Sequence, residues 1–273
     1  MKNVALYFLI SLFSIAANAE TEYVIGRAPQ LSAVAVSQVW TPFIEYLNEY
    51  TGYKFKLKVY QERREFERDV INGSLDFYYG NPGYLVVGKK LHGYDGLVRS
   101  NKKQLKGIIV ARADSGITHI SQLENKDIVF PGKNAFAASL YIRSLLSQEL
   151  KLPFQEKYVT GHDNVYRAVA LGRYPAGGGV VRTFDREPAT LKSKLKIIYE
   201  TPGMAPHPVA VHPRVPSAVK KALADTVLEM PNSPEGNALL TKVKIQKPVK
   251  VDYKRDYLPV EAIALNMYAD LVK

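Results

Sequence analysis

The order of apolar and polar positions predicts strands and helices that alternate along the chain. Residues 23–26 form a short apolar run, as expected of a first strand. From Val36 to Leu47, apolar side chains recur every three or four residues, which predicts one buried helix face. Two more apolar runs, at 55–60 and 75–78, predict the next strands, with a charged helix between them. This alternation indicates a parallel sheet wound from β-α-β units.

A second set of elements follows in the middle of the chain. Residues 105–111 form a strong strand that could carry the chain out of the first lobe, and a new strand is predicted at 127–130. Residues 136–150 then predict a long helix, which Asn134 could cap. The next unit, 158–184, contains a strand, a helix and a second strand.

The chain then returns to the first lobe. A strand at 195–199 leads into a Pro-rich crossing at 201–208 and a return strand at 209–211. Three predicted helices complete the chain, at 217–230, 235–243 and 259–273. We therefore expect an α/β fold of two lobes with a hinge and a central cleft. Lobe one comprises 20–110 and 201–273, and lobe two comprises 111–200.

The first residues are typical of an export signal. Lys2 gives a positive start, residues 4–15 are apolar, and small residues at Ala17 and Ala19 suit a cleavage site. The apolar run is shorter than the about 20 residues that span a bilayer. We expect a signal peptide at 1–19, cleavage after Ala19, and a protein exported to the periplasm.

Composition narrows the set of partners. The chain has no cysteine, which excludes disulfides and thiol chemistry. Its formal charge of +11 comes from scattered lysines, and Lys54, Lys56 and Lys58 alternate with apolar residues as on the wet side of a half-buried strand. Most of this charge serves solubility, and a general positive field would also attract anionic ligands. Export and the lack of a recognition motif argue against nucleic acid as a partner.

The unit at 158–184 carries the first candidate site residues. Asp163 or Asn164 stands where a helix N-cap belongs, so His162 falls at a helix N-terminus and Arg182 lies just past the next strand. Unpaired amide N–H groups and the helix dipole favour an anion at such a place. Alternatively, His162 only caps the helix and Arg182 forms a surface ion pair.

Several phrases of the sequence, in their order and spacing, resemble one family. Residues 72–84 read Asn-Gly-Ser-Leu-Asp-Phe-Tyr-Tyr-Gly-Asn-Pro-Gly-Tyr, and Gly161-His162-Asp163 is followed by a helix and Gly172. Both phrases are similar to the PhnD-like periplasmic binding proteins of phosphate, phosphite and phosphonate ABC transporters. The resemblance covers essentially the whole mature chain. It implies a type II periplasmic binding protein, in which two α/β lobes close around a ligand.

Two departures from the family pattern indicate a divergent branch. The family's serine/threonine-rich turn, whose hydroxyls hold the ligand, is here Asn134-Ala135-Phe136-Ala137. This turn has lost the hydroxyls and keeps the backbone N–H groups of a helix start, which can still hold an anion. The acidic residue that the family carries after Gly172 is also absent, which argues against an aminoalkylphosphonate.

Other candidate site residues follow predicted strands or lie on the crossing. Arg27 follows the first strand and could contact a ligand in the cleft. Tyr79 and Tyr84 either pack in the core or form an aromatic wall with hydroxyl donors. His207, between two prolines on the crossing, is either a hinge residue or a ligand contact. The run Gly177–Gly179 allows either close helix–sheet packing or approach of a ligand to the backbone.

These observations favour a periplasmic solute-binding protein, expected to be a monomer, that delivers a small anion to an ABC permease. The alternative is a sensor of the same fold that presents its ligand to a membrane signalling protein such as a histidine kinase. An exported enzyme is disfavoured, because the sequence contains no nucleophile elbow, metalloprotease or P-loop motif. We expect no cofactor and no metal, since the histidines lack metal-ligand spacing.

Overall fold

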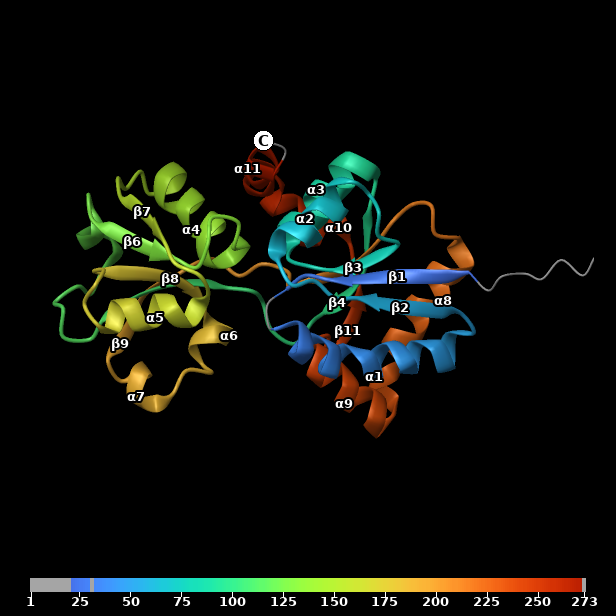
Figure 1. Ribbon diagram of the computed structural model, residues 1–273. Helices are drawn as coiled ribbons and strands as arrows, with labels where there is room; N and C mark the ends of the chain where they lie inside the picture. Colours follow the sequence, from blue (N-terminus) through green and yellow to red (C-terminus); the bar gives the residue numbers. More distant parts are fainter. Residues whose placement is uncertain (1–20, 30–31, 272–273) are drawn as a thin grey trace, which may run out of the picture.

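The computed structural model describes residues 21–29 and 32–271, which form two α/β lobes joined by extended chain (Figure 1). The predicted signal peptide at 1–19 and its cleavage site lie outside the described residues. Within the described residues, no helix is long and apolar enough to cross a membrane.

Lobe one is built on a six-stranded sheet, whose order is β11-β4-β10-β3-β1-β2. Strands β2, β1 and β3 are parallel, with Ile25 opposite both Leu57 and Phe77, whereas β10 runs antiparallel to its neighbours β3 and β4. The parallel core agrees with the β-α-β pattern of the sequence. The bounds are β1 Glu22–Arg27, β2 Lys54–Lys58, β3 Phe77–Tyr79, β4 Asp95–Ser100, β10 Pro208–Val211 and β11 Pro248–Lys250.

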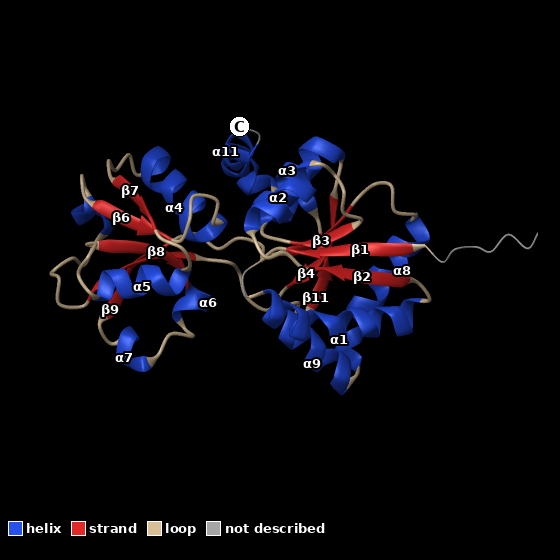
Figure 2. Cartoon of the chain, in the orientation of Figure 1, coloured by secondary structure: helices blue, strands red, loops and turns tan. Residues whose placement is uncertain are grey.

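Helices cover both faces of this sheet (Figure 2). Helix α1 buries Trp40, Phe43 and Leu47 in a core that α8 and α9 complete. It begins at Ser32, whose side chain accepts from the N–H of Ala35, and ends at Gly52 in the left-handed conformation. The bounds are α1 Ala33–Thr51, α2 Arg63–Ile71, α3 Pro82–His92, α8 Ser217–Glu229, α9 Pro234–Val243, α10 Tyr253–Asp256 and α11 Glu261–Leu271.

Lobe two is built on a five-stranded sheet of order β7-β6-β8-β5-β9. Strands β7, β6 and β8 are parallel, and β5 is antiparallel to both β8 and β9. The strand bounds are β5 Gly107–Arg112, β6 Asp127–Phe130, β7 Gln155–Tyr158, β8 Ala176–Val180 and β9 Leu195–Glu200. Helices lie on both faces: α4 Tyr141–Ser144, α5 His162–Ala170, α6 Val181–Phe184 and α7 Ala189–Lys192.

Three predictions about elements were wrong. The lobe boundary at residue 110 falls inside β5, which pairs only within the second sheet, so the chain crosses at 101–106 instead. Strands β4 and β11 were not predicted, because β4 has little apolar alternation and β11 is only three residues long. The segment 136–150 is helical but not one α-helix, since π-helical turns at Phe136–Leu140 and Leu145–Glu149 flank α4.

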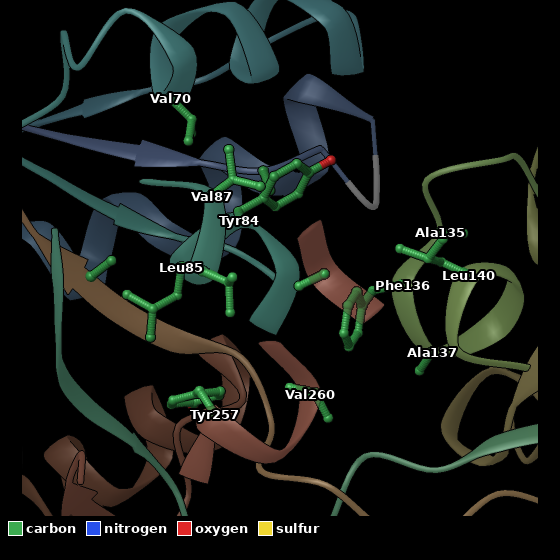
Figure 3. Packing of buried hydrophobic residues seen from close by; sticks show 14 of the residues in the cluster. Val70, Tyr84, Leu85, Val87, Ala135, Phe136, Ala137, Leu140, Tyr257 and Val260 are labelled. Carbon is green, nitrogen blue, oxygen red and sulfur yellow. The ribbon is translucent and has the colours of Figure 1, made fainter. Parts of the chain in front are cut away.

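The two crossings, 101–106 and 201–207, pair with each other between the lobes. The N–H of Leu105 donates to the carbonyl of Met204 at 2.9 Å, and the N–H of Met204 donates back at 3.0 Å. The C-terminal helix α11 packs on α3 and also contacts the π-helical turn Phe136–Leu140 of lobe two. In Figure 3, Phe136 reaches from lobe two toward Val260, and both belong to one apolar cluster. This cluster brings the helix start at Phe136 up against lobe one.

Candidate functional site

A cavity of about 1000 Å³ lies between the lobes and is here called the main cavity. Lobe one contributes Pro29, Arg63 and Asn81, and the crossings contribute Leu105 and His207. Lobe two contributes most of the wall, at 131–132, 135–138, 158–163, 180, 182–183 and 186–187. Its size is at the upper end of the range for small-molecule sites, about 300–1,000 Å³. The cavity therefore combines both lobes in one small-molecule site.

Arg27 ends β1 and is only 6% exposed, and it does not itself line this cavity. Its guanidinium lies 5.1 Å from the ring centroid of Tyr79 and 5.5 Å from that of Trp40. Burial lowers the pKa of Arg27 to about 10, which Tyr79 partly offsets and Arg182 reinforces. Arg27 remains a cation at neutral pH, packed against two neighbouring aromatic rings.

His207 lies at the end of the second crossing and lines the main cavity. Its imidazole stacks on Tyr79, with centroids 5.6 Å apart and planes 28° apart. Burial, followed by the charges of Arg182 and Arg27, lowers the pKa of His207 well below its usual value. The charges of Arg182, from lobe two, and Arg27, from lobe one, therefore both act on His207 of the crossing. Of the predicted ligand contacts, Arg182 and His207 line the main cavity, and their binding of a ligand stays a prediction.

Arg182 and Arg186 project from the region of α6 that follows β8, and both are exposed on the cavity wall. Desolvation lowers the pKa of Arg182, and Arg186 adds to this effect. Within the described part of the chain, neither guanidinium forms a hydrogen bond or an ion pair. The alternative interpretation, in which Arg182 forms a surface ion pair, is therefore wrong. Two cations instead face the cavity with their hydrogen-bonding groups available.

The turn that begins the helical segment at Phe136 forms an apolar wall of the main cavity, from Ala135 to Ala138. The first N–H groups of a helix lack partners within it, so this wall offers amide donors without side-chain hydroxyls. Arg143 braces the turn, donating to the carbonyl of Lys133 at 3.0 Å and to Ser139 Oγ at 3.2 Å. The cap is Ala135 and not Asn134, whose buried Oδ1 has no hydrogen-bond partner among the described residues and does not line the cavity.

The glycine run of β8 is explained by packing. A Cβ at Gly177 would press on Val165, one at Gly178 would overlap the carbonyl oxygen of Ala138, and one at Gly179 would overlap Tyr166. The close-packing alternative is therefore the correct interpretation of this run. Its effect on the site is indirect, because it lets the turn at Ala135–Ala138 lie directly on the sheet.

His162 is the first residue of α5 and lines the main cavity, as predicted, although the cap is Gly161 rather than Asp163 or Asn164. Its buried Nδ1 has no hydrogen-bond partner in the described structure. Burial, followed by the charges of Arg63, Arg182 and Arg186, lowers the pKa of His162 to about 4. The neutral imidazole therefore presents one unsatisfied nitrogen close to three arginines.

Tyr84 does not line the main cavity. It is 1% exposed, packs edge-on against Phe66 and donates its hydroxyl to Glu67 at 2.8 Å. The core-packing alternative is therefore correct for Tyr84. Arg63, the first residue of α2, reaches the cavity from the same region and was missed by the sequence analysis. Its position in a charged helix gave no signal that it faces lobe two.

A second cavity of about 570 Å³, here called the basic pocket, adjoins the main cavity. The two share Leu105, Val180, Arg182, Arg186 and His207. Lysines from lobe one and the first crossing complete the basic pocket, and they were also missed, because scattered lysines looked like ordinary surface charge. Within the described residues, no group of His, Asp and Glu could hold a metal ion.

Comparison with known proteins shows which family the chain belongs to. Residues 25–257 match the family described as ABC transporter, phosphonate, periplasmic substrate-binding protein. The chain belongs to this family. It is therefore a periplasmic substrate-binding protein that binds a small molecule and works with a membrane permease, not an enzyme. Family membership confirms the resemblance seen in the sequence and favours transport over the sensor alternative.

Solved structures share the fold of this phosphonate-family binding protein at low sequence identity. PhnD1 from Prochlorococcus marinus in complex with methylphosphonate is 14% identical, with a TM-score of 0.77, over 90% of this chain and 98% of that one. A binding protein component of an ABC phosphonate transporter from Pseudomonas aeruginosa is 14% identical, with a TM-score of 0.74, over 91% of this chain and 87% of that one.

XAC2383 from Xanthomonas citri, bound to ATP, is 15% identical, with a TM-score of 0.78, over 92% of this chain and 99% of that one. None of the curated proteins matches the chain. These likenesses show that the fold is the two-lobed type II fold.

Proposed function

We propose that this protein captures a small phosphorus oxyanion, a phosphonate or related phosphate, in the main cavity and delivers it to its permease. The observation that carries the proposal is the convergence of Arg27, Arg182 and His207. Apart from Tyr79, the charged neighbours that shift the pKa of these three groups are other cations. Like charges gathered in a cleft are costly without a ligand, and a bound anion would relieve that cost.

Each residue of the proposed site has a physical role. Arg27 is packed against two aromatic rings, so little side-chain entropy is lost when it binds an anion. Arg182 comes from the other lobe, so an anion held by both would favour the closed arrangement of the lobes. The amides near Phe136 and the unsatisfied nitrogen of His162 supply further contacts at the lobe-two wall.

Two solved relatives of the fold hold ligands that contain phosphorus oxyanions: methylphosphonate in PhnD1 and ATP in XAC2383. The loss of hydroxyls at Ala135, Phe136 and Ala137 removes donors that a small inorganic anion would need. The apolar wall that replaces them suits a ligand with an organic substituent. We therefore expect organic phosphonates or phosphate esters to bind more tightly than inorganic phosphate.

Titration calorimetry of the mature protein with phosphate, methylphosphonate, larger alkylphosphonates and sulfate tests the proposal. Arg182→Gln should weaken binding of the preferred anion at least about tenfold, since one charge-assisted contact contributes about 1.5–3 kcal/mol. The matched control is Arg173→Gln, an exposed arginine of lobe two that lines neither cavity, and it should bind as the wild type does. Absence of binding to every anion would refute the proposal.

We also propose export after cleavage at Ala19 and a monomeric mature protein. The N-terminal sequence of the protein recovered from the periplasm should begin at Glu20, and its mass in solution should be that of one chain. A different N-terminus or a stable dimer at micromolar concentration would contradict these proposals.

A further inference from the structure

The basic pocket is lined by cations that come from different parts of the fold. Lys102 lies on the first crossing, Lys244 ends α9 in lobe one, and Arg182 and Arg186 belong to lobe two. The crossing also contributes Lys103 and Lys106. Lys106 pairs with Glu200 at 3.1 Å, and Asp185 is the carboxylate among the lining residues. The pocket therefore has a strong excess of positive charge.

Lys244, although exposed, is affected by this excess of positive charge. Its pKa is lowered by desolvation and then by Arg182, Arg186 and Lys102, all of them cations. In the described structure the ammonium of Lys244 forms no ion pair or hydrogen bond. Its backbone is in the left-handed conformation, with φ 68°, at the C-cap of α9. The fold thus holds a lysine of lobe one opposite two arginines of lobe two, in a pocket where cations outnumber the carboxylate of Asp185.

The basic pocket is also continuous with the proposed ligand site through shared residues. Arg182, Arg186 and His207 line both cavities, and Tyr79, which stacks on His207, lines the basic pocket. An anion at Arg27 and Arg182 would therefore lie next to a second group of cations that a single oxyanion leaves unoccupied. The apolar residues Leu105 and Val180 also line both cavities.

We propose that the ligand carries two anionic groups, one held by Arg27, His207 and Arg182 and the other held in the basic pocket by Lys244, Lys102 and Arg186. This inference rests on the proposed function, because the first group occupies the proposed oxyanion site. The ligand class is an organic bis-anion, such as a diphosphonate or an organic phosphate with a second phosphate or carboxylate. The second group would join lobe one to lobe two across the like charges that otherwise repel, and so favour closure.

The test compares ligands that differ in the second group alone. Propane-1,3-diphosphonate and propylphosphonate have the same carbon chain, and methylenediphosphonate and methylphosphonate form a shorter pair. We expect one diphosphonate to bind at least about tenfold more tightly than its monophosphonate, as one additional charge-assisted contact would provide. Its affinity should also fall more steeply as salt rises, because more exposed charges take part.

Variants locate the second group. Lys244→Gln should remove most of the gain that the diphosphonate shows and leave propylphosphonate binding nearly unchanged. The matched control is Lys247→Gln, because Lys247 is also exposed and left-handed, with φ 49°, but does not line the basic pocket. Lys102→Gln should also reduce the gain in affinity of the diphosphonate over its monophosphonate, independently of Lys244→Gln.

Three results would overturn the inference while the proposed function stands. Monophosphonates could bind as tightly as diphosphonates, or Lys244→Gln could weaken both ligands equally. The gain could also be lost in Arg63→Gln and kept in Lys244→Gln, which would put the second group at the opposite end of the main cavity, near His162. If neither phosphonates nor phosphates bind at all, both the inference and the proposed function are wrong.

Discussion

The imidazole of His207 stacks on the ring of Tyr79, with 5.6 Å between the ring centroids. This contact joins the second crossing to β3 beside the guanidinium of Arg27, which lies 5.1 Å from the same ring. Tyr79 is thus a packing residue through its ring. Its hydroxyl forms no hydrogen bond with any described residue, and Tyr79 lines the basic pocket. The two alternatives for Tyr79 are therefore compatible.

Tyr79→Phe separates these roles. The ring and its stacking on His207 remain, so we expect the free energy of unfolding to change by less than about 1 kcal/mol. Loss of the hydroxyl donor should weaken binding of the preferred anion by about tenfold, as for one hydrogen bond to a charged group. Denaturant unfolding and calorimetry measure the two effects. Unchanged affinity in Tyr79→Phe would leave Tyr79 with a packing role alone.

The neutral state of His162 makes stability depend on pH. The pKa of His162 is about 4 in the folded protein and near 6.5 in an unfolded chain. Between these pH values the imidazole is protonated in the unfolded state and neutral in the folded state. This contribution to stability is therefore present above about pH 6.5 and is lost as pH falls toward 4. His162→Gln should remove this part of the pH dependence.

Urea unfolding of wild type and His162→Gln at pH 7.5, 6 and 5 measures the effect. The wild type should lose more stability than the variant as pH falls through this window. A bound anion should reduce the loss, because it favours the protonated imidazole. If the difference in the free energy of unfolding between wild type and variant does not change with pH, His162 is not a buried neutral group.

The buried ion pair of Arg99 and Asp256 fastens the segment before the C-terminal helix to β4. Both guanidinium contacts are 2.8 Å long, from Nε to Oδ2 and from Nη2 to Oδ1. Burial alone would raise the pKa of Asp256, but hydrogen bonds from Arg255 and Arg99 outweigh it and hold this pKa far below its usual value. The stabilisation is therefore present at neutral pH and is lost only in strong acid.

Asp256→Asn should lower the free energy of unfolding by about 3–5 kcal/mol at pH 7, because it leaves the guanidinium of Arg99 buried and unpaired. The control is Arg255→Gln, which removes an exposed partner of the same carboxylate and should cost less than about 1 kcal/mol. Equal losses in the two variants, measured by urea unfolding, would show that burial of Arg99 does not decide the effect.

Gly178 allows the cavity turn to lie on β8. A methyl group at this position would overlap the backbone oxygen of Ala138 and the ring of Phe130. Gly178→Ala should therefore destabilise the protein by about 1–3 kcal/mol, more than the gain of about 0.4–1 kcal/mol from a stiffer unfolded chain. It should also weaken ligand binding, because the turn at Ala135–Ala138 must move. A variant as stable as the wild type would contradict this account of the glycine run.

Much of the architecture could be predicted from the sequence because it depends on local patterns. The apolar spacing of α1 and the runs at β1, β2 and β6 reflect which face of each element is buried. The same patterns place His162 at a helix start and Arg182 after β8, and both line the main cavity. The predicted lobe boundary was wrong at β5, because a buried strand has the same apolar sequence pattern in either sheet.

The tertiary structure alone decided which polar side chains share the site. Tyr79 and Tyr84 stand five residues apart in similar surroundings of the sequence, yet one faces the basic pocket and the other binds Glu67 in the core. Lys244 and Arg63 looked like ordinary surface charge, and only the folded chain places them opposite lobe two. The sequence by itself determined the two α/β lobes and the strand ends that face the cleft. Local periodicity reports burial, whereas electrostatic neighbours more than a hundred residues apart are set by packing, which only the folded structure supplies.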